Sequence, residues 1–197
     1  MKVLFCDIDG TLTTTISGAT FKQSPDDIKI LKGADRAIAY HSQKGYLIVG
    51  ISNQGGVGAG HKTIEDAIAE MQNTLNLFPQ LESIFFCPDF DGRICWEVGR
   101  GYAPRETRSF KFGESWNNET FFAIISHPEQ TRLNFRKPEP GMVEYSYGTL
   151  STDRGGIYQL SPPSECLLVG DRSEDRVCAI CAGVNFLDAD TWRSQYS

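Results

Sequence analysis

Two aspartates separated by one residue follow a short apolar run near the start of the chain. Residues 3–8 are expected to form a buried strand, and Asp7-Ile8-Asp9-Gly10-Thr11 leads from it into a polar turn. Carboxylates this close together need a cation, a shared proton or different roles. The Asp7 and Asp9 pair is therefore a candidate for metal binding and for acid and base catalysis.

Further polar groups stand where later apolar runs end. Ser52 and Asn53 offer a hydroxyl, an amide and backbone donors that suit phosphate oxygens. Asp171 and Asp175 follow another apolar run, and a set of oxygen ligands suits Mg²⁺ better than zinc. Lys137, in a Lys-Pro step, can compensate negative charge as a phosphoryl group moves. Together these residues predict a magnesium site that acts on a phosphate ester.

Strand and helix patterns alternate along most of the chain. Strands are expected over residues 3–8, 46–52, 83–87, 166–170 and 184–187, and helices over residues 26–44, 63–77 and 173–182. Short, uninterrupted apolar strands between helices indicate an α/β fold, a Rossmann-like three-layer parallel sheet with helices on both faces. Ligands of such sheets bind beyond the carboxyl ends of the strands. Residues 88–136 lack this alternation and are expected to form an irregular insert or lid before Lys137.

The polar motifs, taken in order, resemble those of the haloacid dehalogenase superfamily of phosphatases. The matching segments are Asp7-x-Asp9-Gly10-Thr11, Ser52-Asn53, Lys137-Pro138 and Gly170-Asp171-x-x-x-Asp175. The resemblance implies that Asp7 is a nucleophile that forms an aspartyl-phosphate. It also implies that Asp9 is the general acid and base, which protonates the leaving oxygen and then activates water.

The same resemblance implies the binding roles. Mg²⁺ would be held by Asp7, the main-chain carbonyl of Asp9 and Asp171, with Asp175 as a further metal-side ligand or an orienting group. Phosphate would be bound by the following residues: Gly10, Thr11, Ser52, Asn53 and Lys137. Lys137 would also bridge the phosphate and the nucleophile.

The motifs resemble two branches of these phosphatases, which differ in substrate. Residues 7–21 and 27–31 resemble the phosphatase domain of polynucleotide kinase 3'-phosphatases, whereas Gly170-Asp171-Arg172-Ser173-Glu174-Asp175 resembles the histidinol-phosphate and heptose-bisphosphate phosphatases. The favoured substrate is a 3'-phosphorylated end of DNA or RNA. The alternatives are a small metabolite, such as histidinol phosphate or a sugar bisphosphate, and a noncatalytic protein that binds a phosphorylated ligand. The complete set of acids argues against the noncatalytic alternative.

The expected insert is rich in basic and aromatic residues. These are Arg93, Arg100, Arg105, Arg108 and Lys111, interleaved with Trp96, Tyr102, Phe110 and Phe112. Such a segment can bind a single strand through phosphate contacts and base stacking, or it can be a solvated loop around its own aromatics. The net charge of -6 confines any nucleic-acid contact to a local groove.

Two further patterns resemble known binding motifs, but each departs from its motif and neither site is expected. Cys87 and Cys95 resemble half of the zinc loop of the heptose-bisphosphate branch, but Asp89 stands at the usual His position and residues 133–135 lack the second cysteine pair. A complete set of four tetrahedral ligands is therefore not available, and we expect no structural zinc. The glycine-rich residues 55–63 fail the nucleotide P-loop spacing because His61 separates Gly60 from the following lysine.

Length and composition bound the class of protein. The 197 residues fit a single domain over residues 1–197. No stretch approaches the ~18 apolar residues of a membrane span, and no secretory leader is evident. We therefore expect a soluble cytoplasmic protein with no membrane partner, whose six cysteines are mostly thiols rather than disulfides. The oligomeric state stays open.

Overall fold

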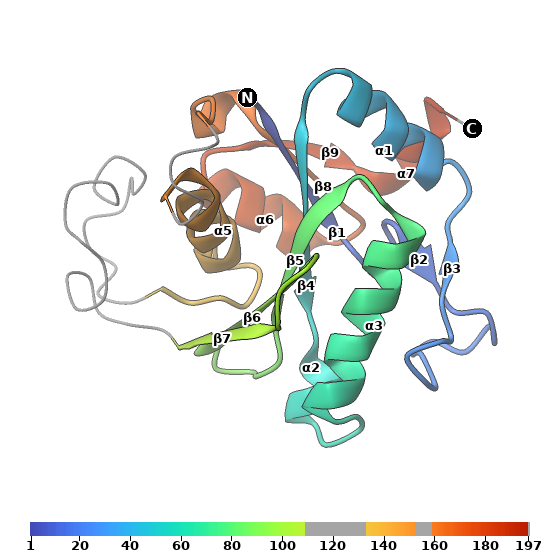
Figure 1. The fold of residues 1–197 in the computed structure, drawn as a ribbon. Coiled ribbons are helices and arrows are strands. Elements are labelled where there is room, and N and C mark those ends of the chain that lie inside the picture. The colour runs from blue at the N-terminus through green and yellow to red at the C-terminus, as the bar shows by residue number, and fades with distance from the viewer. Residues whose placement is uncertain (109–132, 153–158, 197) are drawn as a thin grey trace.

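The computed structural model of the protein describes residues 1–108, 133–152 and 159–196. A seven-stranded sheet runs through its centre in the order β7-β6-β5-β4-β1-β8-β9 (Figure 1). Five strands are parallel: β1 (Val3–Asp7), β4 (Leu47–Asn53), β5 (Leu81–Cys87), β8 (Leu167–Gly170) and β9 (Asn185–Asp188). The predicted α/β fold and its strands are confirmed.

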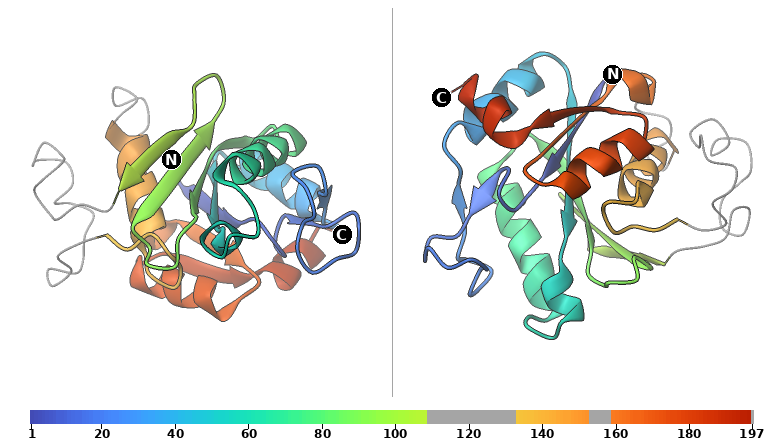
Figure 2. Two further views of the ribbon diagram at one scale, coloured as in Figure 1. Left: turned by 90° about the horizontal axis from the view of Figure 1, so that it is seen from below. Right: turned by 180° about the vertical axis from the view of Figure 1, so that it is seen from behind.

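Helices cover both faces of the sheet, because successive side chains of each central strand point in opposite directions. Val3 and Phe5 of β1 pack in one core cluster with α5 (Gly141–Thr152) and α6 (Ser173–Cys181). Leu4 and Cys6 pack in the other with α1 (Ala34–Gln43), α3 (Ile64–Leu77) and α7 (Ala189–Ser194). Figure 2 shows the sheet between these two helical layers. Two shorter helical elements are α2 (Gly55–Gly58) and η1 (Pro163–Glu165).

The start of α3 follows from its local sequence. The Thr63 hydroxyl accepts a hydrogen bond from the Asp66 N–H at 3.0 Å, and the Asp66 carboxylate accepts one from the Thr63 N–H at 3.3 Å. This reciprocal pair satisfies two backbone donors that the first turn of a helix leaves unpaired. The helix expected to start near residue 63 is therefore confirmed.

The helix predicted over residues 26–44 is wrong in its first half. Residues 13–30 instead form a flap, in which β2 (Thr13–Thr14) pairs antiparallel with β3 (Lys29–Ile30). The Asp27 carboxylate holds the flap loop, because it accepts hydrogen bonds from the N–H and hydroxyl of Ser17 at 2.7 and 2.6 Å and from the Gln23 N–H at 3.1 Å. These bonds lower the pKa of Asp27 to about 2. Ile28 and Leu31 therefore lie outside a helix, although their spacing is typical of one.

The segment predicted to be an irregular insert, residues 88–136, is in part a regular extension of the sheet. β6 (Ile94–Gly99) pairs antiparallel with β5, and β7 (Arg105–Arg108) pairs antiparallel with β6. Cys95 and Val98 of β6 are buried in the two core clusters, which explains why this hairpin joins the sheet. Residues 109–132, with Phe110, Lys111 and Phe112, lie outside the described residues.

The cysteines and helices bear on the expected cellular setting. All six cysteines lie in the described part of the chain, and none of them is in a disulfide. Among the described residues, no helix combines the length and apolar character needed to cross a membrane.

Candidate active site

The three predicted strand-end motifs converge at one edge of the sheet. β1 lies between β4 and β8, so Asp7 at the end of β1 has Ser52 at the end of β4 on one side and Asp171 after β8 on the other. Parallel strands place their carboxyl ends at the same edge, and this edge is where such sheets bind ligands. The structure therefore brings together the residues on which the sequence analysis depended.

A buried lysine joins two of the acids. The Lys137 Nζ lies 2.5 Å from Asp7 Oδ1 and 2.6 Å from Asp175 Oδ1, and the lysine is 4% exposed. The second oxygen of Asp7 accepts a hydrogen bond from the Thr11 hydroxyl at 3.2 Å. Lys137 thus stands beside the predicted nucleophile, and Thr11, predicted to bind phosphate, contacts the nucleophile itself.

The protonation of Asp7 reflects its burial. Burial raises the pKa of Asp7 from 3.8 to about 7, the Lys137 ammonium opposes this rise, and the Asp175 carboxylate adds to it. Burial also disfavours the charged form of Lys137, but the two carboxylates outweigh it and raise the pKa of Lys137. Because folded Asp7 retains its proton where the unfolded chain loses it, ionised Asp7 destabilises the metal-free fold as pH rises from 3.8 to about 7. A nearby cation would relieve this cost.

The acids also fit a hard cation. Asp7, Asp171 and Asp175 each offer a carboxylate oxygen, and these atoms lie within 4.8 Å of one another. Mg²⁺ is bound by such oxygen ligands. The Asp175 oxygens have other partners as well, since Oδ1 contacts Lys137 and Oδ2 accepts a hydrogen bond from the Arg172 N–H at 3.1 Å. These contacts favour the orienting role for Asp175 over direct coordination.

Gly10 makes room for the metal-side acid. Its φ of +89° is one that residues with side chains rarely adopt, and a Cβ there would lie 2.3 Å from Asp171 Oδ2. We expect Gly10→Ala to displace Asp171, lowering activity by at least about tenfold and raising the Mg²⁺ concentration needed for half activity. Steady-state assays over a Mg²⁺ series would measure both.

Gly45→Ala is the matched control for that substitution. Gly45 has a φ of +78° and open space around its Cβ position, so it tests backbone strain without a clash. An equal loss of activity in both variants would contradict the proposed contact with Asp171.

The carboxylate of Asp9 is held from two sides. Its Oδ1 lies 2.5 Å from the Lys22 Nζ, and its Oδ2 accepts a hydrogen bond from the Gln54 amide at 3.0 Å. The same Gln54 nitrogen donates to the Ser52 hydroxyl at 2.9 Å. Sequence reasoning missed Gln54 as a site residue, although it directly follows the Ser52-Asn53 motif.

Lys22 belongs to a small charge network that sequence reasoning also missed. Its ammonium contacts Glu70 of α3 at 2.7 Å, and the other oxygen of Glu70 contacts Lys62 at 2.6 Å. Burial disfavours the charged form of Lys22, but Asp9 and Glu70 outweigh it and raise the pKa of Lys22. Lys22 and Glu70 are 48 residues apart, so no local pattern could have paired them.

Asn53 has a different contact from the predicted one. Its side-chain amide donates to the Lys137 carbonyl at 2.9 Å, and its side-chain oxygen accepts from the Lys137 N–H at 3.0 Å. Both ends of the amide are therefore used to hold the lysine backbone. The amide nitrogen has a second N–H, so the predicted contact with phosphate oxygens stays a prediction.

Arg193 of α7 holds the turn that follows Asp7. One guanidinium nitrogen donates to the carbonyls of Gly10 and Thr11 at 2.8 and 2.7 Å. The arginine is 8% exposed and lies near the other end of the chain. No local pattern indicated that α7 contributes to this turn.

The basic residues of the hairpin have structural partners. Arg100 donates to the carbonyls of Leu75 and Phe78 at the end of α3. Arg105 stacks on the Tyr102 ring at 4.7 Å, and Arg108 pairs with Glu106 at 2.8 Å.

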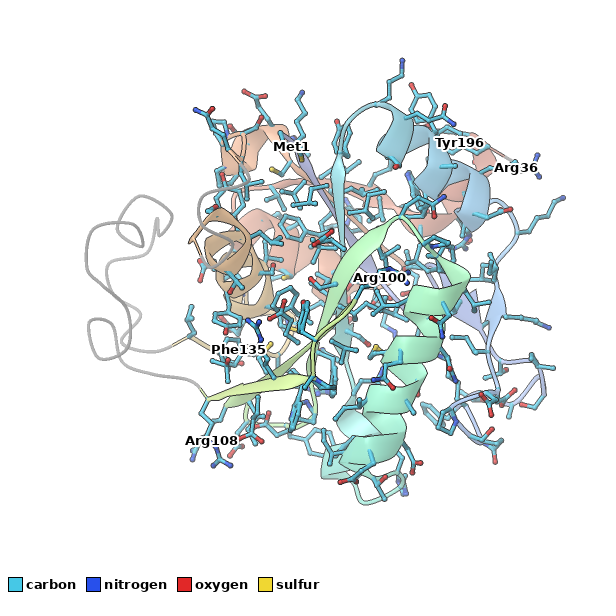
Figure 3. All side chains as sticks on the ribbon, in the orientation of Figure 1. Met1, Arg36, Arg100, Arg108, Phe135 and Tyr196 are labelled. Atoms are coloured by element: carbon cyan, nitrogen blue, oxygen red, sulfur yellow. The ribbon has the colours of Figure 1, made fainter. Side chains whose placement is uncertain are left out.

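Arg100 and Arg108 lie at separate places on the molecule (Figure 3). Arg100 is engaged at the end of α3, whereas Arg105 and Arg108 are exposed, and the rest of the predicted groove lies outside the described residues.

Cys87 and Cys95 are buried side chains of the sheet. The Cys87 thiol lies 3.2 Å from the Asp89 carboxylate. Burial raises the pKa of Cys87 to about 12 and also raises the pKa of Cys95. The expected absence of a structural zinc stays a prediction.

A family model gives the relationship of the chain to known proteins. The model described as polynucleotide kinase 3 phosphatase matches residues 2–192. The chain belongs to this family. It is a phosphatase of the haloacid dehalogenase type, as the motifs predicted.

Named relatives extend over nearly the whole phosphatase. The D-glycero-D-manno-heptose-1,7-bisphosphate 7-phosphatase of Chlorobaculum tepidum is 27% identical over 198 residues, which cover 100% of this chain and 82% of that protein. The D-glycero-beta-D-manno-heptose-1,7-bisphosphate 7-phosphatase of Haemophilus ducreyi is 24% identical over 189 residues, which cover 93% of this chain and 79% of that protein.

Solved structures share the fold of the phosphatase. A putative HAD-like phosphatase from Mesorhizobium loti has a TM-score of 0.61 and 22% identity, covering 93% of this chain and 69% of that chain. A D,D-heptose 1,7-bisphosphate phosphatase from B. bronchiseptica, complexed with magnesium and phosphate, has a TM-score of 0.58 and 21% identity, covering 94% of this chain and 79% of that chain.

Proposed function

We propose that the protein is a Mg²⁺-dependent phosphomonoesterase that removes a phosphate from a small metabolite of the sugar bisphosphate type through an aspartyl-phosphate. The observation that carries the reaction is the buried Asp7 carboxylate, with Lys137 at 2.5 Å and the Asp171 and Asp175 carboxylates beside it. Asp7 would be the nucleophile and Lys137 the cation that compensates charge, beside the acids of the metal site at the carboxyl-end edge of the sheet.

The residues have distinct roles in the proposed reaction. An Asp7 oxygen forms a bond to phosphorus as the ester P–O bond breaks, and Asp9 gives its proton to the leaving oxygen. Water then attacks the phospho-aspartate, gives a proton to Asp9 and releases phosphate from Asp7. Lys137 compensates charge in both steps.

Binding groups and the metal complete this proposal. Mg²⁺, held by Asp7, Asp171 and the main-chain carbonyl of Asp9, would neutralise the phosphate oxygens and keep Asp7 ionised. Ser52 and backbone donors near Gly10 and Thr11 would bind the phosphate. Asn53 would act indirectly, by holding Lys137.

The proposed substrate is a small metabolite, whereas the sequence analysis favoured a 3'-phosphorylated end of DNA or RNA. Relatives that span nearly the whole chain are heptose-1,7-bisphosphate 7-phosphatases, which favours the small-metabolite alternative. The engagement of Arg100 and Arg105 with protein groups also weakens the case for a nucleic-acid end. The chain would act as one catalytic domain. Its free cysteines agree with a cytoplasmic location, where thiols stay reduced.

A direct comparison of substrates tests the proposal. With Mg²⁺ present, a sugar bisphosphate should have a higher kcat/KM than a 3'-phosphorylated oligonucleotide, because Arg100 of the hairpin is bound to carbonyls at the end of α3 instead of being available to a strand. Excess EDTA should stop turnover, and added Mg²⁺ should restore it. Phosphate release assays at low salt measure each case.

Two results would change this reading. A marked preference for the oligonucleotide that declines as salt increases would return the favoured substrate to a nucleic-acid end. Absence of turnover with any ester, including an aryl phosphate, would favour the noncatalytic alternative.

A further inference from the structure

A lysine of the flap lies beside the proposed acid and base. The Lys22 side chain is 5% exposed, and its ammonium contacts Asp9 at 2.5 Å and Glu70 at 2.7 Å. The Asp9 side chain is 42% exposed, so the network opens toward solvent at Asp9 and is closed at Glu70. Lys22 therefore links a buried anchor to an accessible catalytic carboxylate.

The two carboxylates of this network each have a further partner. Glu70 has Lys62 on its second oxygen, at 2.6 Å. The Asp9 carboxylate is oriented by Gln54, at 3.0 Å. Of the two lysines in the network, Lys22 is therefore the one that contacts the exposed Asp9 carboxylate.

The reaction geometry places this cation near the leaving group. For proton transfer, the leaving oxygen must come within about 3 Å of the Asp9 carboxylate. The Lys22 Nζ lies 2.5 Å from the same carboxylate, so the ammonium and the leaving oxygen would approach one and the same side chain. Its unbranched four-carbon chain can turn the ammonium toward an anion there while the flap backbone stays in place.

We propose that Lys22 is a specificity-determining residue that selects phosphomonoesters whose leaving group carries a second anionic group, a phosphate or a carboxylate. The inference rests on the proposed function and narrows its substrate class. It favours a bisphosphate over esters with a neutral leaving group, and it disfavours an amine such as that of histidinol phosphate, whose charge repels the ammonium.

A matched series of small esters tests this selection. The full chain would be assayed with 3-phosphoglycerate, glycerol 3-phosphate and phosphoethanolamine, which have an anionic, a neutral and a cationic leaving group. Wild-type kcat/KM should fall in that order. Lys22→Gln should reduce the ratio of kcat/KM for the anionic ester to kcat/KM for the neutral ester by about tenfold. Lys22→Arg should largely keep this ratio.

Two variants separate recognition from anchoring. Glu70→Gln removes the anchor but keeps the Lys22 charge, so it should preserve the substrate ratio even if overall activity falls. Lys44→Gln removes an exposed charge that stacks on Tyr40, and it should leave every rate unchanged.

The outcomes distinguish the inference from the proposed function. If Lys22→Gln lowers kcat/KM for all three esters by the same factor, or if the wild type shows no preference among them, the inference is wrong. Lys22 would then only position the flap or Asp9. If the wild type hydrolyses none of these esters and no aryl phosphate, the proposed function is wrong instead.

Discussion

Asp7→Asn should abolish phosphate release, with a loss of at least about a thousandfold in kcat, while the protein stays folded. The amide keeps the size of the side chain but is a poor nucleophile toward phosphorus. Folding should persist because Thr11 can still donate to the remaining oxygen and Lys137 retains Asp175 as a partner. The substitution also removes a carboxylate whose burial raises its pKa to about 7, so thermal stability at pH 8 should not fall.

The measurement is turnover of an aryl phosphate, together with a thermal melt of the same preparation. Asp35→Asn, at an exposed position in the first turn of α1, is the matched control and should keep full activity. An Asp7→Asn protein that retained more than a few per cent of wild-type turnover, with contaminating phosphatase excluded, would rule out Asp7 as the nucleophile.

Lys137→Met should lower kcat by a similar factor and should also destabilise the fold. It leaves the Asp7 and Asp175 carboxylates together without the cation that now lies 2.5 and 2.6 Å from them. Removing one partner from a buried ionic group costs about 3–5 kcal/mol. Loss of the ammonium should raise the pKa of Asp7 further above its unfolded value, so stability of the metal-free variant should fall as pH rises from about 6 to 8.

Urea unfolding at the two pH values and aryl phosphate assays would measure these effects. Adding Asp175→Asn to Lys137→Met should restore part of the stability, because one uncompensated charge is removed, but it should not restore activity. Recovery of activity in the double variant would show that Lys137 serves structure alone.

Local sequence was sufficient to find the centre of the site. Asp7 and Asp9 stand at the end of an apolar strand, and Asp171 follows another, so the parallel sheet brings these ends to one edge. The start of α3 was equally readable, because Thr63 and Asp66 form their capping bonds within one turn. In these cases the deciding interactions lie within a few residues or follow from the general geometry of the fold.

Elsewhere tertiary contacts overrode local patterns. The flap replaced the first half of a predicted helix because Asp27 bonds Ser17 and Gln23 while β3 pairs with β2. The described part of the expected insert contains a sheet hairpin, because Cys95 and Val98 are buried in the two core clusters. Spacing and composition indicate local preference only, and packing between distant segments decides which preference prevails.

By itself, then, the sequence determined the fold class, the phosphatase type and the acids at the strand ends, because each depends on short motifs and a regular alternation of strands and helices. Only the tertiary structure decided how those groups are held. Asn53 reaches Lys137 across 84 residues, and Arg193 reaches Gly10 across 183. Lys22 meets Glu70 in the same way. Such contacts arise when separate elements pack together, so they cannot be predicted from the spacing of residues along the chain.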